Sequence, residues 1–332
     1  MRVSLALATV AVAAVVLGVG CGAHRAASAA PKPKPAAKPG LLFGLGPEAD
    51  SARRNALVRQ APVRMLTSWF NSPSDLSWMR SWRPTVIQPA YRKGFALHLI
   101  VWDGGSEGQL DTPYGQACGR AYALSDRFLS DMRVLARVFA GRPGDRLYVT
   151  LFAEFQTYPC KDNAWSPDAA TTAYYEKLKD QYRGALAIFH AEAPNALVSL
   201  GWGGWQASYD TPAIGGGRSL FKHFADVMQE SGFQSFQSLE SPTAVRDAKA
   251  MTRALRPYGP VMLAFYKPLG PSPAAVETRI RSFLSASNLK TLHTDGLFAL
   301  SFMDTTFLRD PGVLGATAAA VTRSACAPCR AP

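Results

Sequence analysis

Two carboxylate residues stand just past the ends of strand-like runs in this chain, where they could act as a catalytic pair. Glu154 follows Leu147–Phe152, an almost wholly apolar run that is typical of a strand buried on both faces. Glu240 follows the run Phe236–Leu239 in the same way. Two carboxyl groups placed across one bond can serve as acid and as base or nucleophile, so the pair predicts general acid/base chemistry.

The residues around Glu154 favour the acid role for this side chain. Ala153 and Phe155 flank it, and an apolar environment raises the pKa of a carboxyl group. Glu154 is therefore the predicted general acid/base, with Glu240 as its partner. The alternative is that a Lys or Arg at the same rim neutralises Glu154. Asp103 and Asp304 follow two other runs and are reserve carboxylates, expected to bind substrate or to orient a neighbour.

Aromatic, amide and charged side chains gather after the same runs. Flat aromatic faces suit the C–H patches of a sugar ring, and amides and carboxylates suit its rim of hydroxyls. The alternative for the tryptophans is that they only cap the hydrophobic core. The predicted substrate-binding set is Trp69, Asn71, Trp102, Asp103, Trp202, Trp205, Gln206, Tyr266, Lys267 and Asp304.

The elements that would position these residues are eight short, mostly apolar runs, several of them separated by amphipathic helical patterns. The alternation predicts a parallel sheet, and the number eight predicts closure into a (β/α)8 TIM barrel of the α/β class, whose strand ends share one face. An open doubly wound sheet is the alternative, but Phe43–Pro47 lacks the glycine spacing of a dinucleotide-binding loop. The expected strands are Leu41–Gly46, Val63–Trp69, Ala96–Trp102, Leu147–Phe152, Leu197–Trp202, Phe236–Leu239, Val261–Phe265 and Leu297–Phe302.

The first forty residues predict export. Residues 1–21 combine Arg2, an apolar stretch and Cys21 in a sequence that resembles a bacterial lipobox, so Cys21 is the predicted lipidation site. Residues 22–40 end in a Pro/Lys-rich tether, and residues 41–332 form the single folded domain. The expected location is the bacterial cell surface, as a lipoprotein. A membrane-spanning anchor is one alternative, and cleavage at Ala27–Ala29 to give a secreted protein is another.

The remaining cysteines and the charge agree with an exported protein. Cys118 and Cys160 would lie in neighbouring loops on one barrel face and are the predicted disulfide, whereas Cys326 could pair with Cys329. The formal net charge is +12, but residues 1–40 hold five Lys or Arg and no acidic residue, so the folded domain carries 31 basic against 24 acidic residues, or +7. This balance is compatible with an anionic envelope polymer or with ordinary solubility. The sequence contains no nucleic-acid motif and no metal-ligand spacing, so we expect no nucleic acid, metal or cofactor to bind. The expected oligomeric state is a monomer. His98 lies within a strand run and is expected to be a hydrogen-bonded core residue.

The order of these features resembles the central portion of the clan A glycoside hydrolases. The likeness rests on Leu147–Gln156, Trp165, the helical pattern from Thr171 and the run Leu197–Trp202, and it extends from Leu147 to Phe302. Within this clan, the order and residue types of these segments most resemble glycoside hydrolase family 26, with its β-mannanases and endoglucanases. The resemblance implies that Glu154 is the acid/base residue. It also implies a nucleophilic Glu near the end of the seventh strand, where this chain has Phe265, and a His where it has Ala153.

Three functions fit this pattern. The first is a diverged hydrolase that uses Glu240 or Asp304 as its second carboxylate and inverts the anomeric centre. The second is a non-catalytic carbohydrate-binding protein that keeps the aromatic residues of the cleft. The third is a surface scaffold for a protein partner, with the tryptophans mostly in the core.

Overall fold

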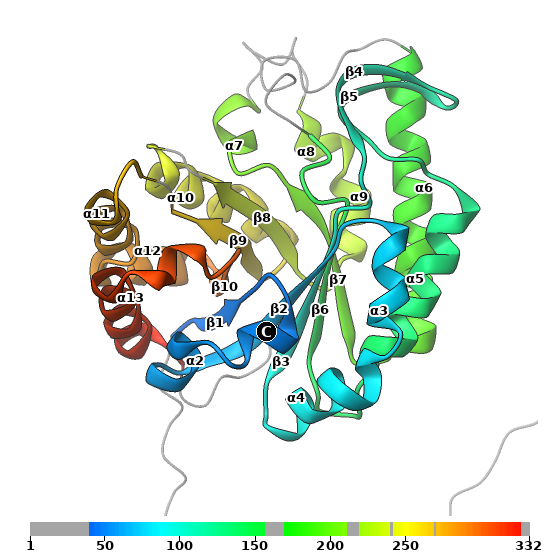
Figure 1. The fold of residues 1–332 in the computed structure, drawn as a ribbon. Helices are drawn as coiled ribbons and strands as arrows, with labels where there is room; N and C mark the ends of the chain where they lie inside the picture. Colours follow the sequence, from blue (N-terminus) through cyan, green and yellow to red (C-terminus); the bar gives the residue numbers. More distant parts are fainter. Residues whose placement is uncertain (1–39, 157–168, 211–218, 240–241, 269, 327–332) are drawn as a thin grey trace, which may run out of the picture. The chain divides into compact units, whose positions relative to one another are not determined.

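Eight parallel strands close into a barrel in the order β1-β10-β9-β8-β7-β6-β3-β2 (Figure 1). The computed structural model describes residues 40–156, 169–210, 219–239, 242–268 and 270–326. The (β/α)8 prediction is confirmed, and each of the eight expected runs overlaps one strand. The barrel strands are β1 (Leu42–Leu45), β2 (Val63–Phe70), β3 (Ala96–Val101), β6 (Leu147–Leu151), β7 (Ala196–Trp202), β8 (Gln234–Leu239), β9 (Val261–Lys267) and β10 (Leu297–Phe302).

Helices connect the strands and cover the outside of the barrel. Among the more regular ones, α5 is capped by Ser125, whose Oγ accepts from the Phe128 amide at 3.4 Å. The helices and short turns are α1 (Ala49–Ala52), α2 (Ala56–Gln60), η1 (Pro73–Asp75), α3 (Leu76–Met79), η2 (Arg83–Ile87), α4 (Gln88–Arg92), α5 (Asp126–Phe139), α6 (Ala169–Glu192), α7 (Gln206–Tyr209), α8 (Leu220–His223), α9 (Ala225–Glu230), α10 (Ala244–Leu255), η4 (Arg256–Tyr258), α11 (Pro273–Phe283), α12 (Ala286–Asp295), η5 (Thr306–Arg309) and α13 (Pro311–Ser324).

An antiparallel hairpin interrupts the strand–helix alternation after β3. Its strands are β4 (Ser106–Thr112) and β5 (Gly115–Ala121), and it lies beside one end of α6 (Figure 1). The Arg120 amide donates to the Phe155 carbonyl oxygen at 3.0 Å, which ties the hairpin to the chain after β6. Cys118, expected in a loop, is a buried residue of β5.

The barrel interior is built in three layers along its axis. The layer at the strand starts is apolar and includes Met65, Tyr148 and Met262. The middle layer is polar: the buried His98 ring contacts Thr150 Oγ1 at 2.9 Å and Thr67 Oγ1 at 3.3 Å, as a hydrogen-bonded core histidine should. Burial lowers the pKa of His98 to about 3, so the ring is neutral. The layer at the strand ends is again apolar and contains Trp69, Ile100, Ala153, Ala264 and Phe265.

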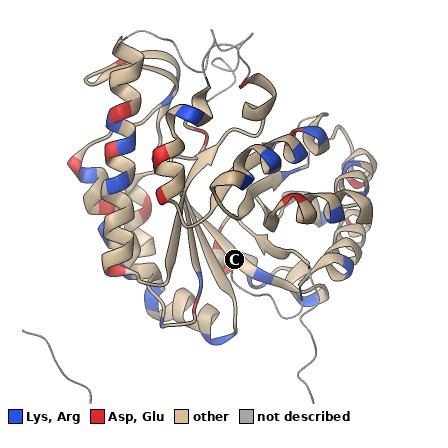
Figure 2. Ribbon diagram, turned by 180° about the vertical axis from the view of Figure 1, so that it is seen from behind, with Lys and Arg blue, Asp and Glu red and all other residues tan. Residues whose placement is uncertain are grey.

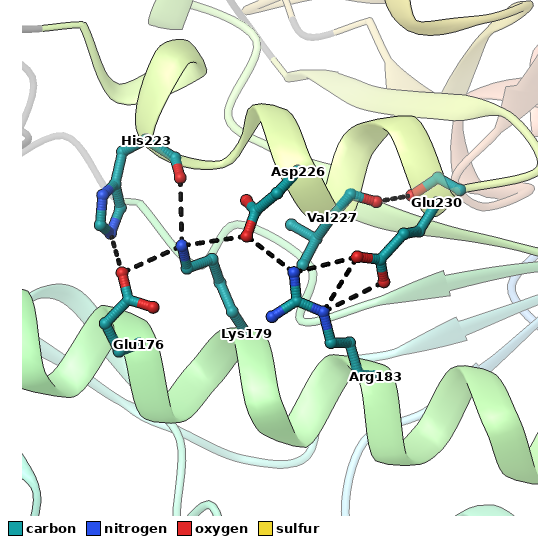
Figure 3. A network of polar contacts seen from close by, with 8 residues as sticks. Glu176, Lys179, Arg183, His223, Asp226, Val227 and Glu230 are labelled. Atoms are coloured by element: carbon teal, nitrogen blue, oxygen red, sulfur yellow. Dashed lines mark hydrogen bonds and ion pairs between the residues drawn. The ribbon is translucent and has the colours of Figure 1, made fainter.

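Ion pairs fasten the outer helix α9 to α6, and His223 Nε2 of α8 lies 3.5 Å from Glu176 Oε1 of α6 (Figure 3). Lys179 Nζ lies 2.9 Å from Glu176 Oε1 and 3.2 Å from Asp226 Oδ2. Arg183 bridges the same Asp226 at 2.7 Å and Glu230 at 3.0 Å. Acidic and basic positions alternate along α6, so this face of the molecule is close to electrically balanced (Figure 2).

Several predicted features lie outside the described residues. These are the leader with Cys21, nearly all of the tether, Cys160 of the predicted disulfide, and Glu240. The export, lipidation, disulfide and Glu240 assignments therefore stay predictions. Within the ranges that the structure describes, no helix is long and apolar enough to cross a membrane.

Candidate active site at the strand ends

Glu154 sits in a tight turn that begins where β6 ends. Phe152 and Glu154 both have left-handed backbone angles, φ +52° and +57°, which are uncommon for residues with a Cβ. The turn is held by its own neighbours: the Ala153 amide donates to Val101 O and the Glu154 amide to Gly201 O, each at 3.1 Å. Backbone strain fixed in this way is a feature of functional sites.

A glycine on the neighbouring strand allows this turn to approach closely. A Cβ added to Gly201 of β7 would lie only 2.8 Å from Ala153 Cα. From the other side, the buried Tyr122 hydroxyl donates to the Ala153 carbonyl oxygen at 2.5 Å. The position of Glu154 is thus determined by β3, β7 and the hairpin segment together.

The carboxyl group of Glu154 is poised to carry a proton. The residue is 8% exposed, and its Oε1 has no hydrogen-bond partner among the described residues. Burial raises the pKa of Glu154 to about 7, the positive charge of Arg120 opposes that rise, and the negative charge of Glu107 adds to it. A carboxyl group with a pKa near neutrality can donate a proton in one step and accept it in another.

Arg120, which sequence reasoning missed, controls the charge beside Glu154. It comes from β5 and is 3% exposed, and its guanidinium lies 3.6 Å from the ring centroid of Trp102. Its Nη1 donates to the Gly105 carbonyl oxygen at 2.5 Å and its Nη2 pairs with Glu107. One face of Trp102 is therefore covered by the hairpin, although the residue as a whole remains partly exposed.

Two aromatic side chains close the centre of the strand-end layer. Trp69 and Phe265 pack edge to face with ring centroids 4.7 Å apart, and both are buried. Trp102 lies 6.0 Å from Trp69 in a tilted arrangement. Phe265 occupies the β9 position at which the family resemblance implies a nucleophilic Glu, so β9 contributes a ring there in place of a carboxylate.

Buried polar atoms without partners mark the same end of the barrel. Within the described part of the chain, Trp69 Nε1, Gln237 Oε1 and both amide atoms of Gln156 have no hydrogen-bond partner. Gln156 follows the Glu154 turn and is 0% exposed. Unpaired buried polar groups cost about 1–3 kcal/mol each, so these atoms favour water or a bound molecule as a partner.

The β7 end differs from the expectation of a sugar platform. Trp202 is 0% exposed and packs against Phe155, Phe221 and Phe224, because its position on β7 points it toward the helices. Trp205 is buried beside Gly203. The amide nitrogen of the buried Gln206 donates to Asp210 Oδ1 at 3.0 Å, while its oxygen has no partner among the described residues.

Three further predicted residues contact neighbours other than Glu154. Tyr266 stacks on Phe283 of α11 with centroids 4.2 Å apart. The Asn71 amides donate to Asp75 in the local turn after β2. Burial raises the pKa of Asp103 to about 6, and its electrostatic neighbours are Asp131 and Arg127 of α5.

Lys267 and Asp304 form a polar pair at the ends of β9 and β10. The Lys267 Nζ lies 3.7 Å from Asp304 Oδ2, and Asp304 Oδ1 accepts from the Thr306 amide at 2.8 Å. Of the predicted site residues, the structure brings Trp69 and Trp102 together in the strand-end layer, with Glu154 on the adjoining turn. In the described ranges, no cluster of three or more His, Cys, Asp and Glu residues could hold a metal ion.

Similarity to known proteins lies in the structure and not in the sequence. No protein-family model matches the chain, and no curated protein matches it. Among solved structures it is similar to glycoside hydrolase GH5_18 of Streptomyces cattleya, with 14% identity and a TM-score of 0.54 over 86% of this chain and 80% of that one. The β-galactosidase of Rahnella sp. R3 matches 87% of this chain with 57% of its own, at 12% identity and a TM-score of 0.54.

The fold is that of the (β/α)8 glycoside hydrolases. The β-glucuronidase of Bacteroides uniformis shows the same likeness, at 10% identity and a TM-score of 0.52, over 80% of this chain but only 30% of its own. The expected resemblance to clan A is thus confirmed at the level of the fold. The closer comparison with family 26 stays a prediction.

Proposed function

We propose that this protein is an exported glycoside hydrolase-like protein that acts on a polysaccharide, with Glu154 as general acid/base. The observation that carries the proposal is the state of Glu154 itself. Its carboxyl group is buried, has a pKa raised to about 7 and has an oxygen without a partner among the described residues. It stands at the end of a barrel strand, where (β/α)8 enzymes keep their catalytic groups.

In this proposal the protonated Glu154 donates to the glycosidic oxygen as the bond to the anomeric carbon breaks. A second carboxylate removes a proton from water, which attacks the opposite face of the sugar and inverts the anomeric centre. Glu240 is the proposed second carboxylate. Asp304, which pairs with Lys267 at 3.7 Å, is the other candidate.

Phe265 supports a second candidate function, that of a non-catalytic carbohydrate-binding protein. Its ring packs against Trp69, and a phenyl group cannot attack an anomeric carbon. A protein of this kind would keep the aromatic and amide groups that hold a sugar while lacking turnover. The partially exposed Trp102 and the unpartnered atoms of Gln156 and Trp69 would serve binding in either case.

The proposed setting is the bacterial cell surface. Cys21 would carry the lipid, residues 22–40 would act as the tether, and the monomeric barrel would meet a polysaccharide or oligosaccharide. The solved structure of GH5_18 contains GlcNAc, which makes amino-sugar glycans one substrate class worth including in a test.

Reducing-sugar release distinguishes the two functions. The protein and Glu154→Gln are compared on β-mannans, β-glucans, xylans and bacterial envelope glycans, with the surface variant Glu277→Gln of α11 as a matched control. We expect the parent protein and Glu277→Gln to release reducing sugar and Glu154→Gln to release none. Glu240→Gln should then lose sugar release in the same way. Binding of one glycan without release by any variant would instead establish the non-catalytic function, and neither binding nor release would refute both.

A further inference from the structure

A cavity of about 440 Å³ opens at the strand-start end of the barrel, opposite the candidate active site. Its walls come from the first residues of β1, β2 and β3, from the segment just before β6, from α4 and from the chain after α13. Arg64 and Arg146 line it together with Asp145, Tyr91, Gly94 and Cys326. Two arginines against one carboxylate make this a cavity for an anionic group.

A second hollow of about 200 Å³ adjoins the first and shares Tyr91 and Asp145 with it. Arg83, Arg92 and Arg142 line this hollow, so the two cavities together present five arginines and one acidic residue. We call this surface the strand-start face. Arg64, Arg92 and Arg142 are exposed on it.

Three arginines of the strand-start face differ from those of the outer helices in their pairing. Within the described residues, Arg64, Arg92 and Arg142 make no ion pair, and Asp145 accepts instead from the Arg142 backbone amide at 2.7 Å. By contrast, Arg137 and Arg183 are paired with carboxylates between the outer helices. The strand-start face therefore carries positive charge that the protein does not itself neutralise.

The polypeptide that precedes the barrel joins it at this same face. The Leu41 amide donates to Ser324 O at 2.9 Å, and the Cys326 amide donates to Leu41 O at 3.1 Å. Leu42, two residues after Gly40, is part of the cavity wall. A barrel held to a surface through its N-terminal segment is attached by the end that carries Arg64, Arg92 and Arg142.

We propose that the strand-start face binds the phosphodiester headgroups of an anionic phospholipid bilayer, with one headgroup seated between Arg64 and Arg146. The guanidinium groups would meet phosphate oxygens, and the opposite end of the barrel would face outward toward a glycan. This orientation adds to the proposed surface location but does not depend on Glu154 being catalytic. Each arginine removed should lower binding to an anionic bilayer about fivefold.

Vesicle sedimentation tests the proposal with the full chain carrying Cys21→Ser, so that no lipid is attached. Phosphatidylglycerol–phosphatidylcholine vesicles are compared with phosphatidylcholine alone, and the ratio of the two partition coefficients is the readout. The apolar leader contributes to both vesicle types, so it largely cancels in the ratio. The test variant replaces Arg64, Arg92 and Arg142 with Gln, and the control replaces Arg127, Lys222 and Arg246 of α5, α8 and α10.

We expect the ratio to fall about a hundredfold in the test variant and to stay within a few-fold of the parent in the control. Thermal unfolding of both variants checks that the barrel is intact. Equal losses in the two variants would overturn the proposal, because net charge alone would then explain binding. Arginine-dependent binding of inorganic phosphate with an unchanged vesicle ratio would also overturn it, in favour of a soluble anion. Sugar release by the same proteins reports separately on the proposed function.

Discussion

Replacement of Glu154 by Gln should stabilise the protein, and the gain should depend on pH. Burial raises the pKa of Glu154 from its ordinary 4.5 to about 7, so the folded state binds this proton more tightly than the unfolded state does. The stability associated with the proton is complete below pH 4.5 and is lost as the pH rises through about 7. At about 1.4 kcal/mol per pKa unit, ionisation costs the folded state about 3 kcal/mol at pH 8.

Gln has nearly the same shape as Glu and never ionises, so the variant avoids that cost. Urea unfolding of both proteins should therefore show a gain of about 3 kcal/mol for Glu154→Gln at pH 8 and less than about 0.5 kcal/mol at pH 4.5. The exposed control Glu277→Gln should show no such trend. A gain that is equal at both pH values, or a loss at pH 8, would refute the view that Glu154 is a desolvated acid.

Three further predictions concern the surroundings of Glu154. Arg120→Gln removes a positive charge and should raise the pKa of Glu154 above about 7, whereas Glu107→Gln removes a negative charge and should lower it. Carbon-13 NMR titration of the Glu154 carboxyl group measures both shifts. Gln156→Met should stabilise the unliganded protein by about 1–3 kcal/mol in urea unfolding and weaken glycan binding, since it removes two unpaired polar atoms. Phe265→Ala should cost about 3–5 kcal/mol in the same assay, and a cost below about 1 kcal/mol would show that the ring does not close the barrel end.

The barrel could be predicted from sequence because each of its strands is buried on both faces. A run such as Leu147–Leu151 is buried at every position and is almost wholly apolar, and that signal can be recognised without any alignment. The position of Glu154 follows from the same signal, since it depends only on where the strand ends. Helices are predicted less accurately from the sequence. Residues 49–60 carry one amphipathic pattern but form two helices, α1 and α2, and the side chain of Asn55 caps the second by accepting from the Leu57 amide at 2.9 Å.

The hairpin and the direction of the tryptophans could not be predicted in this way. β4 is polar and exposed along most of its length, so it lacks the apolar alternation that reveals a strand. Because the hairpin was not predicted, Arg120 of β5 was not recognised as a neighbour of Glu154. Trp202 was expected at a binding surface because it is the last residue of β7. Side chains of successive strand residues point to opposite faces, however, and a shift of one residue places a ring in the core instead of at the rim.

The layered interior limits where catalysis can take place. His98 is the titratable group of the polar middle layer, but burial lowers the pKa of its ring to about 3 and both ring nitrogens contact threonine hydroxyls. The packed rings of Trp69 and Phe265 separate that layer from the strand ends. His98 is therefore both neutral and screened from a substrate, and it cannot replace the carboxylate that β9 lacks. In the proposed hydrolase, proton transfer would therefore take place at the rim, where the charges of Arg120 and Glu107 on the hairpin act on the pKa of Glu154.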